Sequence, residues 1–254
     1  MNSNSGISIP MAEMLRAVVD VHVKDGMVVG LGSGRTMAAL LDSLAGSTTI
    51  NKSSIRFIPT SLQIKMKAEE IGLTIGDESL IPILDLVIDG ADQIDANLVM
   101  IKGGGGALLR EKVLMHAAEK VIILADEGKY VERLTMPIPV EVVPYARVYV
   151  SNVLKGMGAE PRVRTNERGY PVITENGNII IDSAFRSIDE DAGSLEYRLK
   201  CIPGVVEVGL FSRRVADMYY KAMRDGCFEA IWREQGRVMR RRMSMGRVGS
   251  SIDG

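Results

Sequence analysis

Short apolar runs alternate with helical patterns through the first half of the chain. Each run holds four or five residues, many of them β-branched, which is typical of buried strands in a parallel sheet. The runs are Met27–Leu31, Ile55–Ile58, Leu84–Ile88, Leu98–Ile101 and Val121–Leu124, and an apolar helical segment at Met37–Leu44 follows the first of them. This alternation predicts an α/β fold over residues 10–134, with a Rossmann-like parallel sheet and flanking helices.

The pattern changes at Met136-Pro137-Ile138-Pro139. Beyond this point we expect a smaller α+β domain of ferredoxin-like type over residues 135–204. Its expected elements are helices at Tyr145–Lys155 and Asp189–Lys200 and strands at Pro161–Arg164, Asn178–Ile181 and Val205–Phe211. The last strand is a candidate to return to the first domain, and residues 205–224 are therefore a candidate final piece of that domain.

The two ends of the chain differ from the rest. Residues 1–9 are polar, and we expect a disordered leader. Residues 225–254 form a basic extension, with six arginines and one acidic residue between positions 233 and 247. Such a run can bind nucleic acid or an acidic surface, but it is more commonly a solvated or disordered extension. The segment Cys227–Trp232 is a candidate short amphipathic helix before it.

Bulk composition narrows the class of protein. With 254 residues, 46% of them hydrophobic, and a net charge of -1, the chain can bury a sizeable core and shows no overall preference for nucleic acid or membrane. Its two histidines and two cysteines, His22, His116, Cys201 and Cys227, do not form a zinc or redox-pair pattern. We therefore expect no metal and no redox cofactor, and a protein of the reducing cytoplasm.

The segment 84–112 carries the strongest chemical signal. Asp89 and Asp92 follow a predicted buried strand, at the edge of an α/β sheet where ligands collect. Lys102 follows the next strand and precedes four glycines, which allow a backbone to turn sharply and approach a ligand. Glu111 lies near the start of a helix, whose dipole favours a carboxylate that can act as a base. The structural alternative is that the aspartates only form a turn and Glu111 only caps the helix.

Three other loops follow predicted strands. Gly32-Ser33-Gly34-Arg35-Thr36 offers backbone N–H groups and hydroxyls that suit a phosphate, although a plain tight turn is an equal alternative. It lacks the third glycine of a dinucleotide fingerprint, and the chain has no nucleoside-triphosphate loop. Thr60 and Ser61 follow the second strand, and Lys129 follows the fifth, where a lysine is usually a solvated charge.

Taken in order, these motifs resemble those of the ribose-5-phosphate isomerase family of type A. The similar segments are GLGSGRT, PTS, DGADQID, KGGGGALLREK, ADEGK, PVEVVP, NGN and IPGVVEVGLF, which lie between residues 30 and 211. The resemblance covers roughly residues 10–215, and the combination of DGAD with KGGGG and LREK is its most specific part. It implies reversible isomerisation of ribose 5-phosphate and ribulose 5-phosphate without a cofactor.

The resemblance also implies a role for each matching residue. Glu111 corresponds to the proton-transfer base, Asp89 to the carboxylate associated with ring opening, and Asp92 and Lys102 to groups that bind hydroxyls and the enediolate oxygen. The positions that correspond to substrate and phosphate binding are Gly32, Ser33, Gly34, Arg35, Thr36, Thr60, Ser61, Gly103, Gly104, Gly105 and Lys129.

Two positions depart from the family pattern. Arg35 replaces a serine, and Ala12 or a neighbour stands where many members place a phosphate-binding lysine. Arg16 or Arg35 could supply the missing charge, since a guanidinium binds phosphate bidentately.

Two other functional classes stay open at this point. One is a sugar-phosphate-sensing module on the same scaffold, which would not need a proton-shuttling base. The other is acyl or CoA transfer with a glutamate nucleophile. For the isomerase, the expected partners are a small sugar phosphate and further copies of the chain, as a homodimer or homotetramer, with no membrane. Nucleic acid is not an expected partner, and the basic run at 233–247 has no explanation.

Overall fold

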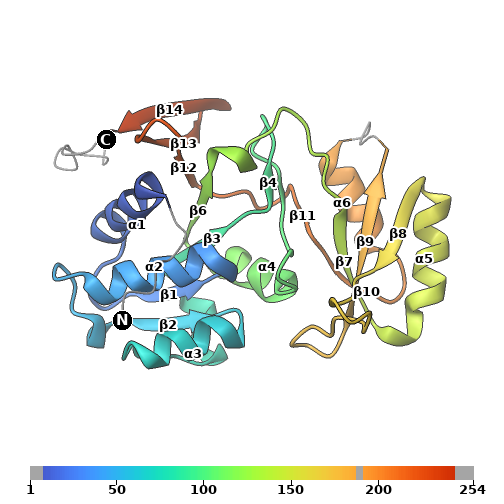
Figure 1. Cartoon of the computed structure of the whole chain (residues 1–254), viewed down its shortest axis with the longest axis horizontal. Coiled ribbons are helices and arrows are strands. Elements are labelled where there is room, and N and C mark those ends of the chain that lie inside the picture. The colour runs from blue at the N-terminus through green and yellow to red at the C-terminus, as the bar shows by residue number, and fades with distance from the viewer. Residues whose placement is uncertain (1–7, 187–190, 244–254) are drawn as a thin grey trace. The chain divides into compact units, whose positions relative to one another are not determined.

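The computed structural model describes residues 8–186 and 191–243. These residues form two compact units, whose elements are labelled in Figure 1. Of the described residues, the first unit draws on 8–90, 117–128 and 216–243, and the second on 91–116, 129–186 and 191–215. Each unit has a sheet of its own and a hydrophobic core of its own.

A seven-stranded sheet forms the first unit, in the order β14-β13-β12-β6-β3-β1-β2. The strands from β12 to β2 pair in parallel, whereas β13 and β14 pair antiparallel at one end. The strands are β1 Val28–Leu31, β2 Arg56–Pro59, β3 Leu86–Gly90, β6 Lys120–Asp126, β12 Met218–Ala222, β13 Phe228–Glu234 and β14 Arg237–Met243. The predicted Rossmann-like parallel sheet is confirmed, and four of the five predicted runs belong to it. The run predicted at Leu98–Ile101 does not, because Met100–Ile101 pairs antiparallel in a separate small sheet.

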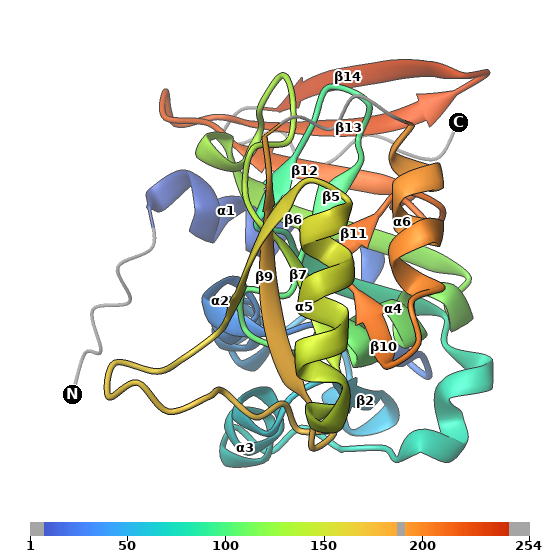
Figure 2. The same cartoon turned by 90° about the vertical axis from the view of Figure 1, so that its right-hand side faces the viewer.

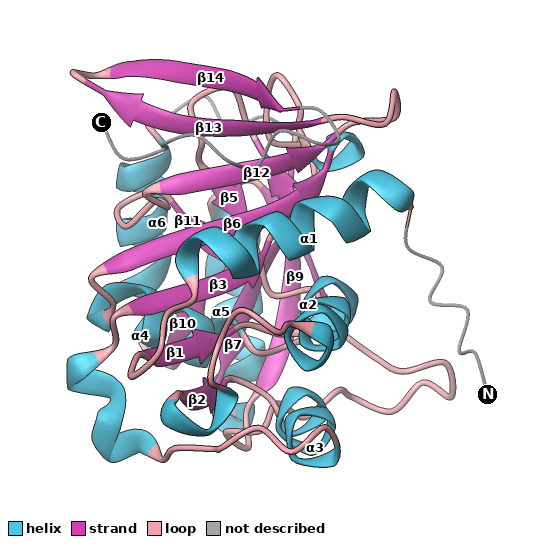
Figure 3. Ribbon diagram, turned by 90° about the vertical axis from the view of Figure 1, so that its left-hand side faces the viewer, coloured by secondary structure: helices cyan, strands magenta, loops and turns pink. Residues whose placement is uncertain are grey.

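Helices α1, α2 and α3 lie over one face of this sheet, as Figure 3 shows. They span Ile9–His22, Gly34–Gly46 and Leu62–Glu70. In α1, Met14, Leu15 and Val18 are buried at the three- and four-residue spacing of one helix face. Ser8 is the N-cap and Pro10 lies in the first turn, so Ile9, which was expected in the leader, belongs to a helix. Residues 1–7 lie outside the described residues.

The second unit contains a four-stranded antiparallel sheet in the order β10-β7-β9-β8. Its chain order is strand, helix, strand, strand, helix, strand, which is the ferredoxin-like arrangement that was predicted. The elements are β7 Ile138–Val142, α5 Arg147–Gly156, β8 Ala159–Val163, β9 Ile179–Phe185, α6 Ala192–Lys200 and β10 Val205–Val208. In Figure 2, α5 and α6 lie on the same face of this sheet.

A smaller three-stranded sheet belongs to the same unit, in the order β11-β5-β4. Its strands are β4 Gln93–Ile94, β5 Met100–Ile101 and β11 Leu210–Phe211, and α4 follows at Leu108–Ala117. Four short 3-10 helices complete the described elements: η1 Lys52–Ser54, η2 Glu78–Ile83, η3 Glu127–Lys129 and η4 Pro144–Ala146. Of the helices described, none is long and apolar enough to span a bilayer.

The single strand predicted at 205–211 is wrong in two respects. It is divided at Gly209 into β10 and β11, which join two different sheets, and neither joins the sheet of the first unit. The Gly209 N–H donates to the Pro139 carbonyl at 2.7 Å, and a Cβ at Gly209 would lie 2.3 Å from the Lys102 carbonyl oxygen. Two neighbouring backbones therefore approach here so closely that only glycine fits.

The tail is also different from its prediction. Residues 228–234 form β13 rather than a helix, and 237–243 form β14 rather than a solvated extension. Phe228 and Ala230 alternate along β13 toward the core of the first unit, and Trp232 packs against it. The arginines of β14 lie on the exposed edge strand, where charge opposes edge-to-edge aggregation. Met245 and Arg247 of the basic run lie outside the described residues.

The packing of β13 predicts that Phe228→Ala will destabilise the protein by about 3 kcal/mol, because it leaves a cavity in the main core. The free energy of unfolding in urea measures this. The matched control is Met239→Ala on β14, since Met239 is 38% exposed against 3% for Phe228. Equal, near-zero effects of both changes would show that the hairpin does not contribute to the fold.

Candidate functional site

The strand order of the first unit reverses at β1, whose carboxyl end lies beside that of β3. The chain passes from β1 to β2 on one side of β1, and β3 pairs with β1 on the other side. Ligands of open α/β sheets bind at such a reversal of strand order. Gly32 follows β1 and Asp89 lies near the end of β3, so both stand at this point.

Gly32 and Asp89 are in close contact. The Gly32 N–H donates to the Ile88 carbonyl at 2.9 Å, and a Cβ at Gly32 would lie 1.7 Å from Asp89 Oδ1. The Asp89 side chain is buried, and Oδ1 accepts a hydrogen bond from the Gly90 N–H at 2.7 Å. Glycine at position 32 is therefore what allows a carboxylate to occupy this place.

Helix α2 begins directly after this contact. Ser33 is its N-cap residue, and Gly34 has a φ of +82°, which favours glycine. Arg35 and Thr36 follow in the first turn, where backbone N–H groups and the helix dipole favour an anion.

Arg35 and Thr36 line a pocket of about 720 Å³ in the first unit. Two other cations in its wall, Lys67 and Arg224, already form ion pairs with Asp42 and Glu127 at 2.7 and 2.9 Å. The described residues include no hydrogen-bond or ion-pair partner for the Arg35 guanidinium, which leaves its charge available to an anion.

Thr60 and Ser61 follow β2 at the same edge of the sheet. The Thr60 N–H donates to the Leu31 carbonyl at 2.9 Å. Its hydroxyl is buried, with no hydrogen-bond partner among the described residues. The Ser61 hydroxyl accepts from the Ile64 N–H at 3.4 Å and so caps α3. Ser61 thus has a local structural role, whereas the Thr60 hydroxyl retains its bonding capacity.

The second unit contains a buried ion pair, between Lys102 and Glu111. The distance from Lys102 Nζ to Glu111 Oε2 is 3.1 Å, and each side chain is only 3% exposed. Lys102 directly follows β5, and Glu111 is in the first turn of α4. The four glycines between them reverse the chain, with left-handed φ angles at Gly103 and Gly106. Strand, glycine turn and helix therefore bring an acid and an ammonium group together.

Asp92 is held by the backbone on both sides of Lys102 in the chain. Its N–H donates to the Ile101 carbonyl at 2.9 Å, one residue before Lys102, and its Oδ2 accepts from the Gly104 N–H at 2.7 Å. Arg164 fixes the turn from the other side, because its Nη1 donates to the carbonyls of Gly103 and Gly104 at 2.7 and 3.0 Å. The same guanidinium pairs with Asp182 at 2.5 Å.

Three of the four predicted catalytic residues thus lie in one compact unit, and Asp89 lies in the other. Gly105 is exposed in the glycine turn, and Lys129 is half-buried at the end of η3. Within residues 8–186 and 191–243, no three His, Cys, Asp or Glu side chains gather as metal ligands.

Sequence reasoning missed Arg164. It directly follows β8, which ends at Val163, one residue earlier than predicted. Its contacts reach glycines 60 and 61 residues away, and no local pattern signals such a contact. Arg110 and Lys112, which flank Glu111 on α4, were likewise given no role, although both form ion pairs within the second unit.

Comparison with known proteins identifies the family. The model of the family described as ribose 5-phosphate isomerase A (phosphoriboisomerase A) matches residues 56–226. The ribose-5-phosphate isomerase A of Archaeoglobus fulgidus is 46% identical over 198 residues, which are 77% of this chain and 87% of that protein. The chain belongs to this family. The family match ends at Gly226, so the strands β13 and β14 lie beyond it.

Solved structures of this isomerase agree in fold. The ribose 5-phosphate isomerase A of Methanocaldococcus jannaschii is 36% identical, with a TM-score of 0.80, over 88% of this chain and 98% of that one. A D-ribose-5-phosphate isomerase in complex with phospho-erythronic acid is 37% identical, with a TM-score of 0.81 and the same coverage. The family is thus shown along most of the chain.

The contact between Gly32 and Asp89 predicts that Gly32→Ala will lower the free energy of unfolding by about 1–3 kcal/mol, because the new methyl group must displace a buried carboxylate. Urea denaturation measures the change. In the matched control, Gly46→Ala, the added Cβ meets nothing within 4 Å. If Gly32→Ala were as stable as the control, Asp89 would have room to move.

Proposed function

We propose that this chain interconverts ribose 5-phosphate and ribulose 5-phosphate through an enediolate, with Glu111 as the base. The observation that carries the proposal is the buried pair of Lys102 and Glu111 on either side of the glycine turn, 3.1 Å apart. Such a pair supplies both needs of the reaction, a base for the proton and a positive charge for the oxyanion. Membership of the isomerase family supports it independently.

The proton moves between two neighbouring carbons of the open sugar. Glu111 removes the proton from C2 of the aldose, and the electron pair moves onto the C1 carbonyl oxygen, which gives the enediolate. The hydroxyl proton on O2 then passes to O1, and Glu111 returns its proton to C1 as the C2 oxygen becomes the carbonyl of the ketose. The low exposure of Glu111, 3%, limits side reactions of the enediolate with bulk water.

Lys102 and the aspartates complete the chemistry. The Lys102 ammonium stabilises the negative oxygen of the enediolate, and Asp92, held by the Gly104 N–H, accepts hydrogen bonds from sugar hydroxyls. By the family resemblance, Asp89 assists the opening of the furanose ring. Only two residues of chain separate Asp89 from Asp92.

The phosphate group is assigned to the start of α2. Arg35 and Thr36 line the pocket there, and the Arg35 guanidinium has no partner among the described residues. A related isomerase binds phospho-erythronic acid, which combines a phosphate with a carboxylate on a short carbon chain. We assign Lys129 and the Thr60 hydroxyl to the same substrate.

The cellular setting follows from the same assignment. We propose that the chain works in pentose phosphate metabolism, in the cytoplasm, and as a homo-oligomer, a dimer or a tetramer. Sedimentation of the purified protein determines the number of copies.

For Glu111→Gln we expect kcat to fall by about 10³-fold, because the amide cannot accept the proton. A coupled assay with ribose 5-phosphate measures this. Binding of phospho-erythronic acid, measured by calorimetry, should stay close to wild type, since the amide keeps the shape of the side chain. Turnover like that of the wild type in this variant would remove Glu111 from its role.

Solvent label separates the isomerase from the two alternatives. During turnover in deuterated water, the isomerase should place solvent deuterium on C1 of ribulose 5-phosphate and on C2 of ribose 5-phosphate. A transferase with a glutamate nucleophile would instead form a covalent acyl-enzyme, and a sensor would bind the sugar phosphate without any conversion.

For Arg35→Ala we expect KM to rise about tenfold with little change in kcat, because a charge-assisted hydrogen bond to phosphate contributes about 1.5–3 kcal/mol. Steady-state kinetics measure both constants. Lys67→Ala is the matched control, since Lys67 lines the same pocket but is paired with Asp42. If the two variants had equal KM values, Arg35 would not contact the phosphate.

A further inference from the structure

We propose that Lys112 is a positioning residue of the isomerase, whose buried ammonium group sets the rotation of α4 and so directs Glu111 toward Lys102. The inference rests on the proposed function, because it concerns the same base. Lys112 is the residue after Glu111, and its side chain leaves the helix in a different direction, about 100° away.

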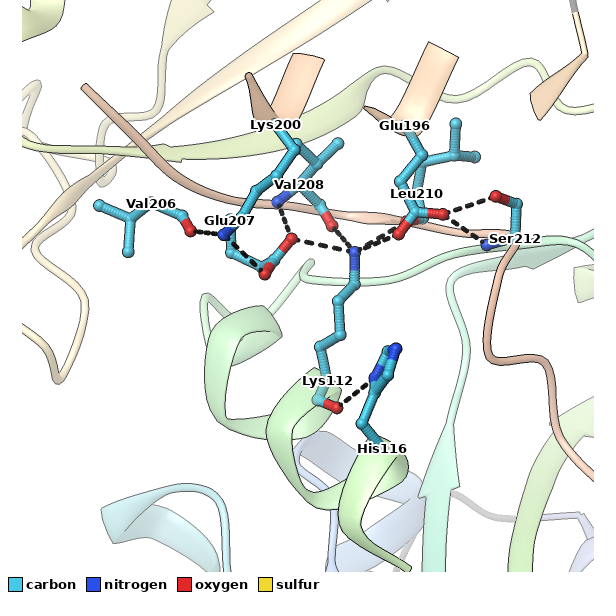
Figure 4. Close-up of polar contacts among 9 residues, drawn as sticks. All are labelled: Lys112, His116, Glu196, Lys200, Val206, Glu207, Val208, Leu210 and Ser212. Atoms are coloured by element: carbon cyan, nitrogen blue, oxygen red, sulfur yellow. Dashed lines mark hydrogen bonds and ion pairs between the residues drawn. The ribbon is translucent and has the colours of Figure 1, made fainter. Parts of the chain in front are cut away.

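Lys112 lies in a cluster within the second unit, shown in Figure 4. Its Nζ contacts Glu196 Oε1 at 2.7 Å and Glu207 Oε1 at 3.1 Å. The same atom donates to the carbonyls of Val208 and Leu210 at 2.7 and 3.0 Å. With 8% of the side chain exposed, nearly all hydrogen bonding of this ammonium group is to the protein.

The two carboxylates of the cluster are held in turn by other groups. Glu196 Oε2 accepts from the N–H and the hydroxyl of Ser212 at 2.9 and 2.5 Å. Glu207 Oε1 accepts from the Val208 N–H at 2.8 Å, and its Oε2 pairs with Lys200 at 3.0 Å. Each carboxylate therefore has one orientation, and the ammonium group is bound at one place.

Electrostatics keep Glu207 charged inside this cluster. Burial of its carboxyl opposes ionisation, but the charge of Lys112, the Val208 N–H and hydrogen bonds from Lys200 and Lys112 outweigh it and lower the pKa of Glu207 below its usual value. Glu207 thus stays charged at neutral pH.

The segment 208–211 links this cluster to the proposed catalytic lysine. The carbonyls of Val208 and Leu210 accept from Lys112, whereas the carbonyl of Gly209, between them, accepts from the Lys102 N–H at 2.9 Å. The centre of the Phe211 ring lies 4.5 Å from Lys112 Nζ and 5.6 Å from Lys102 Nζ. One short segment therefore holds both the helix that carries Glu111 and the backbone that carries Lys102.

Stability alone does not account for such a cluster. A buried ion pair can often be replaced by apolar residues without loss of stability, because removing charges from water is costly. Hydrogen bonds from one ammonium group to carbonyls and carboxylates at fixed places add directional constraints to those of apolar packing. A misplacement of a catalytic group by about 1 Å can cost about 10²-fold in rate.

The experiment compares three variants with the wild type, by coupled assay and by urea denaturation. Lys112→Met leaves Glu196 without its cation, so we expect lower stability together with a kcat reduced about 10–100-fold. In the double variant Lys112→Met/Glu196→Gln the uncompensated charge is gone, while Glu207 keeps Lys200. We expect stability to return toward wild type and kcat to stay low, with KM changed less than about twofold in both.

Lys200→Met is the matched control. It removes the other cation from Glu207, but Lys200 is 44% exposed and does not contact the segment 208–211 in any described hydrogen bond. We expect its kcat to equal that of the wild type.

The outcomes separate three conclusions. Recovery of kcat together with stability in the double variant, or an unchanged kcat in Lys112→Met, would overturn the positioning role and leave a structural one. If Lys112→Met does not fold, the double variant decides alone by the same criterion. A wild type that does not convert ribose 5-phosphate would instead refute the proposed function itself.

Discussion

The buried ion pair between Lys102 and Glu111 constrains the path of the chain around it. Both side chains are almost fully buried, and each charge removed from water costs several kcal/mol unless it is matched closely. The two groups come from a strand and a helix, so they can meet only if the chain reverses within a few residues. The glycine turn, with left-handed φ angles at Gly103 and Gly106, makes that reversal possible.

The same constraint explains where the supporting contacts lie. A turn of four glycines has little rigidity of its own, because glycine loses more conformational freedom on folding than any other residue. The order of this turn must come from its surroundings. Arg164 supplies it through the carbonyls of Gly103 and Gly104, and Asp92 supplies it through the Gly104 N–H. Asp92, which we propose as a substrate-binding residue, thus also stabilises this glycine turn.

Much of the architecture could be predicted from the chain because the signals are local. The buried strands of the first unit are short β-branched runs, and the ferredoxin-like unit has a distinct order of strands and helices. The tail could not be predicted in this way. Phe228, Ala230 and Trp232 alternate as in a strand, but the arginines that follow them favoured the prediction of a solvated extension. The segment forms a strand because it pairs with β12, and this pairing cannot be read from the local sequence. The break at Gly209 depends on backbones distant in sequence.

The candidate site also combines residues that have a local sequence signal with residues that depend on distant contacts. The acids, the lysine and the glycines are visible in the sequence because each stands after a strand or at the start of a helix. The groups proposed to position them are not visible in the sequence. Lys112, for example, contacts Glu196 and Glu207, which lie 84 and 95 residues further along the chain. Contacts of this length are set by the fold, and each uses a residue type, arginine, lysine or glutamate, that is ordinarily a solvated surface charge. These side chains differ from ordinary surface charges in being buried, and which charged positions are buried depends on how the sheets assemble. A residue beside a catalytic group on the same helix is therefore worth testing whenever its charge proves to be buried and fully bonded, because its contacts then constrain the direction of its neighbour.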